Sequence, residues 1–531
     1  MQQKSMMAWL AWGVALGFAL IVAGERVGGL LANSLAVCLP AAAAALLLAG
    51  PVAVVISRTE VRGRGPAVAL LAAMALVPLH VVVAGWLAAI GDFGWGPALF
   101  AGDGPVRGWV AGRSGAAALH AVAATPLAAL LGVAALESID RRREEQALVE
   151  APRRAVFFKV TLSEAAPALA AAVILLAVVA ATEIAVTDLL RVRTFAEEVY
   201  TQAAAGTLLG VGEDSGGAVR LAAGVAAMAL AAAAAAAVLV GRLAAPRETP
   251  GRDARGLVFR PAPRLLAAAA AVVLVLLCAV PVGSMVRTAG LVVEGSPGRP
   301  ERVWRPAKAL AAVAAAPWQQ RRELTVSLTL GGVVATAATA AAAGVVWGVR
   351  RRPAAERLAA GALLVLAATP GPVVGVVVIR LLNRPLDSPV WWIGELYGTW
   401  FAPGLAQLLR ITPIAALVLW PALRATPDEL LDAARVDGAG RLRRLVSIVA
   451  PGVWPSLAAA WLTSLAFSVG ELPATLLTAP PGWSPLSVRL LSLLHYGVED
   501  RVAAICLVLT LGYAAAGLAV ARLLHARGDR R

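Results

Sequence analysis

The chain has 531 residues, of which 60% are hydrophobic and 15% are charged, and its mean hydropathy is +0.77. A soluble domain of this length is far less apolar, so the composition excludes that class and indicates a polytopic membrane protein. The formal net charge is +15. In a membrane protein such an excess is typical of arginine retained on the cytoplasmic side, and no recognised nucleic-acid-binding fold accompanies it. We therefore expect the lipid bilayer, and no nucleic acid, as a partner.

Twelve apolar stretches are long enough to cross a membrane, since a spanning helix needs about 20 apolar residues for about 30 Å of hydrocarbon. The first six cover residues 8–24, 30–57, 66–90, 116–136, 165–187 and 218–241. The second six cover residues 265–286, 323–348, 358–381, 402–423, 455–470 and 502–524. The first stretch follows Lys4 as a signal peptide would, but no small-x-small cleavage site follows it, so we expect an uncleaved span. The predicted fold class is an all-α polytopic membrane protein with twelve transmembrane helices.

The arginine distribution predicts that both termini lie in the cytoplasm. This orientation places four arginine clusters inside, at 58–64, 141–143, 350–352 and 527–531. The Arg/Pro-rich segment 242–264 also falls inside, where it is predicted to link two halves of the chain. The basic stretch 288–322 falls outside against this rule, because longer loops can translocate regardless of their charge.

An internal repeat is the strongest organisational signal. The segment that begins at Thr125, TPLAALLGVAALESID, matches the segment that begins at Thr412, TPIAALVLWPALRATP, at an offset of 412 − 125 = 287. Further along, Glu183 in TEIAVT matches Glu471 in GELPAT, at an offset of 471 − 183 = 288. Shared Pro, Glu and Thr positions at a nearly constant offset are hard to attribute to alanine-rich composition. The chain is therefore predicted to be a tandem duplication of a six-span unit.

The segment 424–454 is charged and amphipathic, yet it lies between two long apolar stretches. Asp432, Ala433 and Ala434 are followed by Gly438 and, further on, by Ile448 and Pro451. This spacing resembles the EAA loop of ATP-binding-cassette importer permeases, E-A-A-x3-G-x9-I-x-L-P, with Asp432 in place of Glu and Ala450 in place of Leu. The resemblance implies a short coupling helix that docks on a separate ATPase subunit. The alternative is an ordinary interfacial amphipathic helix.

The predicted helix has one apolar side and ends at Gly438. Leu430, Leu431, Ala434 and Val436 can line one side of it. Gly438 can end the helix in a left-handed conformation, which is costly for other residues.

The first half carries a degenerate copy of this loop at 137–164. At the repeat offset, Glu145, Gln146 and Ala147 correspond to Asp432, Ala433 and Ala434, and Glu150 corresponds to Asp437. One residue is lost before Val160, so the counterpart of Gly438 is either deleted or replaced by Ala151. The first loop therefore keeps its acid and lacks its glycine. Two such loops at equivalent places favour the coupling interpretation over the interfacial one.

Other segments, such as TFAEEVY from Thr194 and GELPATLLTAPPGWSPLSVRLLSLLHYG from Gly470, resemble the fused, two-domain permeases of ferric-iron and thiamine importers. The resemblance implies two tandem six-helix type I importer permease units. These are residues 1–241, with a core at 30–241, and residues 265–531, with a core at 323–524. It further implies a bacterial cytoplasmic (inner) membrane protein, ferric iron as the leading substrate, and alternating access as the mechanism. Its partners would be two ATPase subunits and an external solute-binding protein, and a single copy of the chain would supply both permease halves.

The sequence carries no sign of catalysis or of a bound cofactor. No G-x-x-x-x-G-K-[ST] phosphate loop occurs, so any ATP would be hydrolysed by partner subunits and the chain is not expected to be an enzyme. The cysteines, Cys38, Cys278 and Cys506, lie inside apolar stretches without metal-binding spacing, so neither a metal site nor a disulfide framework is predicted.

Three residues are candidates for the translocation pathway. Glu183 and Glu471 fall at the ends of equivalent spans, where an acid is costly unless it faces water, a partner or the bundle interior. Loop positions just outside the membrane, or structural hydrogen bonding, are the alternatives. His80 follows Pro78 inside an apolar stretch, where a helix break with a packed histidine competes with a pathway role.

An ion-gradient-driven secondary transporter with two six-span halves is the alternative function. Glu183, Glu471 and Asp188 would then be proton carriers. The paired loops argue against it. A membrane-bound enzyme or scaffold is a third, less supported class.

Overall fold

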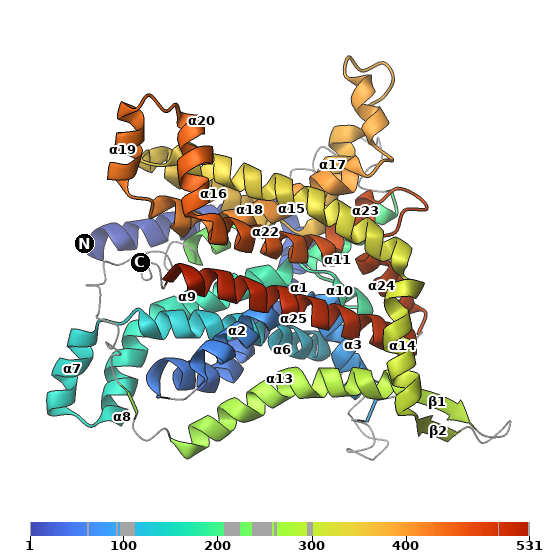
Figure 1. The fold of residues 1–531 in the computed structure, drawn as a ribbon, viewed down its shortest axis with the longest axis horizontal. Coiled ribbons are helices and arrows are strands. Elements are labelled where there is room, and N and C mark those ends of the chain that lie inside the picture. The colour runs from blue at the N-terminus through green and yellow to red at the C-terminus, as the bar shows by residue number, and fades with distance from the viewer. Residues whose placement is uncertain are drawn as a thin grey trace.

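A computed structural model describes residues 2–60, 63–91, 94–95, 112–206, 224–235, 258–259, 263–294, 301–497 and 499–528. Most of this length is helical, and many of the long helices run along the long axis of the molecule (Figure 1).

The first part of the chain is built from helical elements. They are α1 (Gln2–Arg58), α2 (Arg64–Ala75), α3 (Leu79–Ile90), α6 (Gly112–Glu137), α7 (Arg141–Glu150), α8 (Arg153–Val156), the π-helix η1 (Phe157–Thr161), α9 (Leu162–Ala181), α10 (Ala185–Leu189) and α11 (Phe195–Ala204). A further short apolar helix covers Gly224–Ala235.

The second part begins with α13 (Arg264–Gly290), two strands, β1 (Leu291–Glu294) and β2 (Glu301–Trp304), and α14 (Pro306–Gln319). It continues with α15 (Arg321–Val349), α16 (Pro353–Ala368), α17 (Gly371–Leu382), the 3₁₀ helix η2 (Trp391–Leu396), α18 (Phe401–Arg424), α19 (Asp428–Val436), α20 (Arg441–Arg444) and the π-helix η3 (Leu445–Val449). The last elements are α21 (Ala450–Gly452), α22 (Trp454–Val469), α23 (Pro473–Thr478), α24 (Leu486–His495) and α25 (Glu499–Gly528). The antiparallel pair β1 and β2 departs from the all-α prediction.

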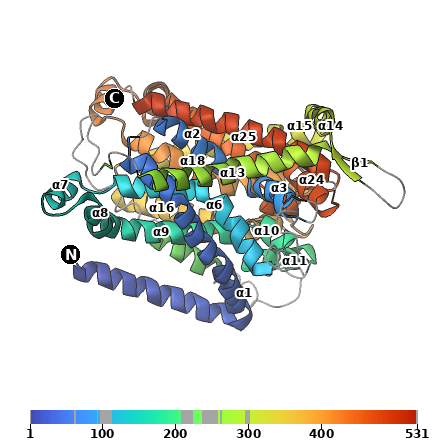
Figure 2. The ribbon, with the colours of Figure 1, turned by 90° about the horizontal axis from the view of Figure 1, so that it is seen from below.

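Seven helices of the described chain are long and apolar enough to cross a membrane, or up to ten if three bent helix pairs each count as one span. The chain is therefore a multi-span membrane protein, but the predicted twelve spans are not confirmed. The stretches 8–24 and 30–57 join in one helix, α1, which bends (Figure 2). The stretch 218–241 is described only over 224–235, which is too short to span by itself. The predicted linker 242–264 lies mostly outside the described residues.

Two predicted spans are sharply broken at a proline. The axes of α2 and α3 differ by 97°, and those of α16 and α17 differ by 102°. Pro78 precedes α3 with ψ 145°, and Pro370 precedes α17 with ψ 142°, both far from helical backbone. Proline lacks the N–H that a continuous helix needs and disfavours helical geometry in the residue before it, so each apolar stretch divides there.

The same order of elements occurs twice along the chain. Helices α7 and α19 begin at an offset of 428 − 141 = 287, and the π-helices η1 and η3 begin at an offset of 445 − 157 = 288. Helices α9 and α22 end at an offset of 469 − 181 = 288, and α10 and α23 begin at an offset of 473 − 185 = 288. The matched π-helices, and the break between α9 and α10 that recurs between α22 and α23, show that backbone irregularities, and not only apolar composition, recur at the sequence offset.

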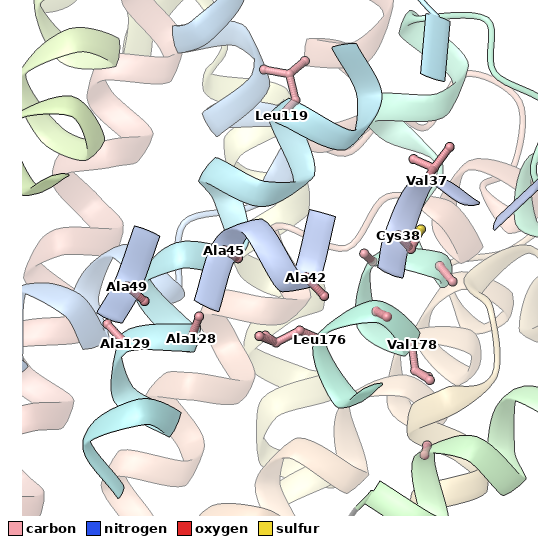
Figure 3. Packing of buried hydrophobic residues seen from close by; sticks show 14 of the residues in the cluster. Val37, Cys38, Ala42, Ala45, Ala49, Leu119, Ala128, Ala129, Leu176 and Val178 are labelled. Carbon is pink, nitrogen blue, oxygen red and sulfur yellow. The ribbon is translucent and has the colours of Figure 1, made fainter. Parts of the chain in front are cut away.

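Small side chains let α1 and α6 approach closely (Figure 3). Ala42, Ala45 and Ala49 of α1 are buried, as are Ala128 and Ala129 of α6. Lipid offers no hydrophobic driving force between helices, so close backbone packing of small residues is a main source of association.

The two ends of the molecule differ. Helices α7 and α19 extend from one end, where α1 begins and α25 ends (Figure 1). Strands β1 and β2 and helix α14 lie at the opposite end in both views (Figures 1 and 2). Two helices at equivalent places in the repeat thus reach the same end of the molecule.

Candidate functional site: two end helices and an internal ion cluster

Helix α19 contains Asp432, Ala433 and Ala434 of the predicted second loop and ends where the sequence predicts. Gly438 has φ +77°, in the left-handed region. Its N–H donates to the carbonyl of Arg435, and the N–H of Ala439 donates to the carbonyl of Ala434 at 2.9 Å. This pair of bonds is a Schellman motif, which satisfies carbonyls left free at the helix end and favours glycine at that position.

The apolar side of α19 is narrower than predicted. Leu431 and Ala434 are buried, whereas Leu430 and Val436 are exposed. Leu431 packs in the same apolar cluster as Val449 of η3. The exposed leucine and valine therefore take no part in packing α19 against the spans. Of the other predicted residues, Asp432 and Ala433 lie in α19, and Pro451 lies in α21, after the π-helix η3.

Two arginines hold the first residue of α19. Asp428 accepts hydrogen bonds from Arg350 Nη2 at 2.9 Å and from Arg351 Nε at 3.0 Å. The hydrogen bond from Arg351, with the positive charges of both guanidinium groups, holds the pKa of the Asp428 carboxyl below its ordinary value. The carboxylate also lies at the N-terminus of the helix, where the helix dipole favours negative charge.

Helix α7 is attached by a buried ion pair in addition to the apolar packing of Ala147 and Leu148. Glu144 is fully buried and Arg58 is 4% exposed. Arg58 donates through both terminal nitrogens, with Nη1 to Oε2 and Nη2 to Oε1 both 2.9 Å. Thr161 of η1 also donates to Glu144, at 2.7 Å, and Arg58 donates to the carbonyl of Leu136 at 2.6 Å. At the repeat offset Leu431 stands where Glu144 stands, so the two end helices reach the spans by different chemistry.

Of the sequence-predicted residues of α7, Glu145, Gln146 and Glu150 are exposed, and Ala147 packs against the core. Glu145 is exposed and pairs with Arg141 one turn earlier. Gln146 and Ala147 follow it, and Glu150 is the last residue of the helix.

Sequence reasoning missed Glu144, although a signal was present. Glu144 shares helical spacing with Ala147 and Leu148, which pack against the core. An acid on the packed side of a helix needs a partner, because burial of an unpaired charge is costly.

The C-terminus of α7 also differs from that of α19. Ala151 follows α7 with extended backbone, at φ −141° and ψ 149°. Gly438 has the left-handed conformation at the matching place. The predicted lack of the glycine in the first loop is thus accompanied by a different helix end.

Inside the spans, one arginine lies between the two predicted pathway acids. Arg410 of α18 approaches Glu471 at 3.3 Å, from Nε to Oε1, and Glu183 at 3.9 Å, from Nη2 to Oε1. Its Nη1 donates at 3.1 Å to the carbonyl of Thr369, just before the break between α16 and α17. The structure therefore brings Glu183 and Glu471 together, and Arg410 is a residue that sequence reasoning missed.

The two acids have different surroundings despite their equivalent places. Glu471 accepts from the backbone N–H of Ala474 at 3.0 Å and of Thr475 at 2.9 Å, which caps α23. Gln407 donates to the Thr475 hydroxyl at 2.9 Å. This buried network supports the structural alternative for Glu471, whereas Glu183 has the more exposed side chain, at 25% against 5%.

His80 is buried in the first turn of α3, directly after the break at Pro78. Within the described part of the chain no hydrogen bond or ion pair joins it to Arg410. The predicted helix break is confirmed at this place, and a pathway role for His80 stays a prediction.

Comparison with known proteins identifies one region of similarity. Residues 340–530 match the family described as binding-protein-dependent transport system inner membrane component. The chain is 32% identical over 142 residues to the trehalose/maltose transport system permease protein MalF of Thermococcus litoralis, covering 25% of this chain and 48% of that protein. It is 27% identical over 154 residues to the sulfoquinovosyl glycerol transport system permease protein SmoG of Agrobacterium fabrum, covering 28% of this chain and 50% of that protein.

A third relative is the diacetylchitobiose uptake system permease protein DasB of Streptomyces coelicolor, 27% identical over 152 residues, with 25% of this chain and 46% of that protein covered. The matches span about half the length of these curated relatives. Their names refer to sugars and sugar derivatives. The expectation of ferric iron, and of the ferric-iron or thiamine subgroup, finds no support among them.

Proposed function

Because residues 340–530 match the inner membrane component of binding-protein-dependent transport systems, we propose that this chain is the permease subunit of an ATP-driven importer. ATP is hydrolysed by separate subunits, and an external binding protein delivers the solute. The observation that carries the proposal is the pair of short helices, α7 and α19, that extend from the same end of a multi-span bundle (Figure 1).

A single copy of the chain supplies both permease units in this proposal, at residues 1–241 and 265–531. The recurrence of α7, η1, α9 and α10 at the two repeat offsets supports two tandem units. Each unit offers one end helix, so two ATPase subunits would dock on one chain. The end that carries α7 and α19 would then face the cytoplasm, with both termini on that side of the cytoplasmic membrane.

The substrate proposed is a sugar or a sugar derivative. The support comes from the names of the relatives, which are permeases of systems for trehalose, maltose, sulfoquinovosyl glycerol and diacetylchitobiose.

In this mechanism the end helices transmit force and the spans change access. Closure of an ATPase dimer moves α7 and α19 toward each other. Helix α19 moves η3 through the apolar cluster that Leu431 and Val449 share. Helix α7 moves α1 and η1 through the hydrogen bonds of Glu144 with Arg58 and Thr161. The two units then rock, and the pathway opens toward the binding protein.

The test is reconstitution of the chain in liposomes with and without the ATPase and the binding protein encoded by neighbouring genes. We expect uptake of a labelled disaccharide that requires ATP and both partners. Uptake driven by an ion gradient in vesicles with the chain alone would overturn the proposal and favour the secondary transporter. Uptake of ferric iron in place of the sugar would overturn the substrate assignment alone.

A further inference from the structure

The short helices α10 and α23, which occupy equivalent places in the two repeats, meet in one apolar cluster. Ala185 and Leu472 are buried there, together with Leu491 of α24. Leu189 and Leu476 pack against them. We call this contact the seam. Its helices lie in the part of the molecule nearer to β1 and β2 than to α7 and α19 (Figure 1).

Two charged contacts cross the boundary between the repeats beside the seam. Glu183, two residues before Ala185, lies 3.9 Å from Arg410. Asp188, inside α10, lies 3.4 Å from Nε2 of His495, the last residue of α24. The second contact is an ion pair when His495 is protonated.

Charge is distributed unequally between the two sides of this boundary. Both acids belong to the first repeat, and both basic side chains, Arg410 and His495, belong to the second. The counterpart of Arg410 is Ala123, at an offset of 410 − 123 = 287, and the counterpart of Asp188 is Leu476, at an offset of 476 − 188 = 288. Neither contact can therefore form between the equivalent residues of the opposite repeat. Both contacts join the first repeat to the second.

The contact of Arg410 with Glu183 is partly shielded from water. The side chain of Arg410 is 15% exposed and that of Glu183 is 25% exposed. Ion pairs that are partly withdrawn from water are screened less than surface pairs, so their loss has a larger effect on an equilibrium between two conformations. Arg410 also has Glu471 as a second partner, so the contact with Glu183 can separate without leaving the arginine unpaired.

We infer that Arg410 and His495 are further residues of the translocation pathway, which hold the seam closed through Glu183 and Asp188. The seam is the part of the pathway that separates when the chain opens toward the end that carries β1 and β2. This inference rests on the proposed function for the meaning of opening, but the closed seam itself is a property of the chain alone.

The test uses the full-length chain in liposomes, with Cys38, Cys278 and Cys506 replaced by alanine and Leu472→Cys as a reporter. Leu472 is fully buried in the seam, so its reaction with a membrane-impermeant maleimide reports separation of α10 from α23. Ala185→Cys, on the other side of the seam, is a second reporter for the case that the first does not fold. The variants are Glu183→Gln, Asp188→Asn and the two combined, each accepted only if it elutes as a single species.

The matched control is Glu356→Gln. Glu356 pairs with Arg424 at 3.2 Å within the second repeat, so its replacement removes an ion pair of similar length without touching the seam. We expect each seam variant to raise the labelling rate by about twofold to fivefold and the combination by about tenfold, while the control stays unchanged. An unchanged rate in the combined variant, or an equal rise in the control, would overturn the inference.

The outcome separates this inference from the proposed function. Faster labelling of the seam variants, together with no ATP-dependent uptake by the wild-type chain, would support the seam and reject the importer. ATP-dependent uptake with unchanged labelling would support the importer and reject the seam contacts.

Discussion

Glu144 shows how much one buried acid contributes at the scale of single residues. Replacing it by leucine, the residue at the equivalent place in the second repeat, leaves the buried Arg58 without its carboxylate. We expect Glu144→Leu to lower the free energy of unfolding by about 3–5 kcal/mol, because an uncompensated buried charge is strongly destabilising. Adding Arg58→Met is expected to recover most of the loss, since an apolar pair can replace an ion pair. Thermal unfolding in detergent measures both.

The control for this prediction is Glu145→Leu, one residue further along α7 on its exposed side. Its effect is expected to stay within about 0.5 kcal/mol, as for other surface changes. Equal effects of the Glu144 and Glu145 replacements would show that the buried pair does not hold α7.

Asp428 gives a pH dependence with a definite sign. The pKa of its carboxyl is lower in the folded chain than its ordinary value of 3.8, chiefly because of the hydrogen bond from Arg351. The stabilisation of α19 is therefore complete above the ordinary value and is lost as the pH falls through the lower, folded value. We expect wild type to unfold at a higher temperature than Asp428→Asn at pH 7, with the difference shrinking as the pH falls below 3.8 and lost below the folded-state value. A difference that persists in strong acid would contradict the assignment.

At the scale of elements, the contact of α3 with α13 depends on a glycine. A Cβ added at Gly85 would lie 2.8 Å from Pro281 Cβ and 3.4 Å from the terminal methyl carbon of Met285. We expect Gly85→Ala to destabilise the chain by about 1–3 kcal/mol, the usual range for overpacking. Gly344→Ala in α15 has open space around the new methyl group and serves as the control, with no loss expected. Thermal midpoints in detergent distinguish the two.

The elements that could be predicted from sequence are those with a local signal. The end of α19 at Gly438 follows from glycine chemistry, and the breaks of α2–α3 and α16–α17 occur at prolines that the sequence displays. Hydropathy divides the stretch 8–24 from the stretch 30–57. The residues between them do not forbid helix, so the two stretches join in one helix that hydropathy could not predict. The β1–β2 pair depends on cross-strand hydrogen bonds, which a search for apolar periodicity does not detect.

At the scale of the whole molecule, unequal end helices predict unequal coupling. Gly438→Pro removes the left-handed helix end and Asp432→Arg reverses a charge on α19, whereas Glu145→Arg changes an exposed residue of α7. In the reconstituted importer we expect the first two to uncouple ATP hydrolysis from uptake more severely than the third, by roughly tenfold in uptake per ATP. Gly440→Ala is the control, since Gly440 has φ −63° and open space around it.

Equal loss of ATPase co-purification from variants of both end helices would contradict this asymmetry. If Gly440→Ala also lowered uptake per ATP, the loop would be sensitive to any change. The left-handed backbone of Gly438 would then not explain the effect of Gly438→Pro.

The site could be predicted in part because the repeat placed Glu183 and Glu471 in equivalent positions. Their convergence on Arg410 could not be predicted, because Arg410 has an alanine counterpart and belongs to a different helix from either acid. Arg410 meets the two acids only because the fold places α18 beside the ends of α9 and α22. Glu144 was missed for a related reason, since its partner Arg58 lies 86 residues away.

The different attachments of α7 and α19 have a consequence for how strongly each helix would bind an ATPase subunit. In the proposed importer, two identical ATPase subunits would meet one helix held by the buried Glu144–Arg58 ion pair and another packed by the buried Leu431. Identical ligands on non-identical sites titrate as two classes, so under this proposal we expect a biphasic binding isotherm for the ATPase in place of a single hyperbola. A permease built from two identical chains would offer equivalent sites, whereas the two unlike units proposed for this chain would be occupied in a preferred order.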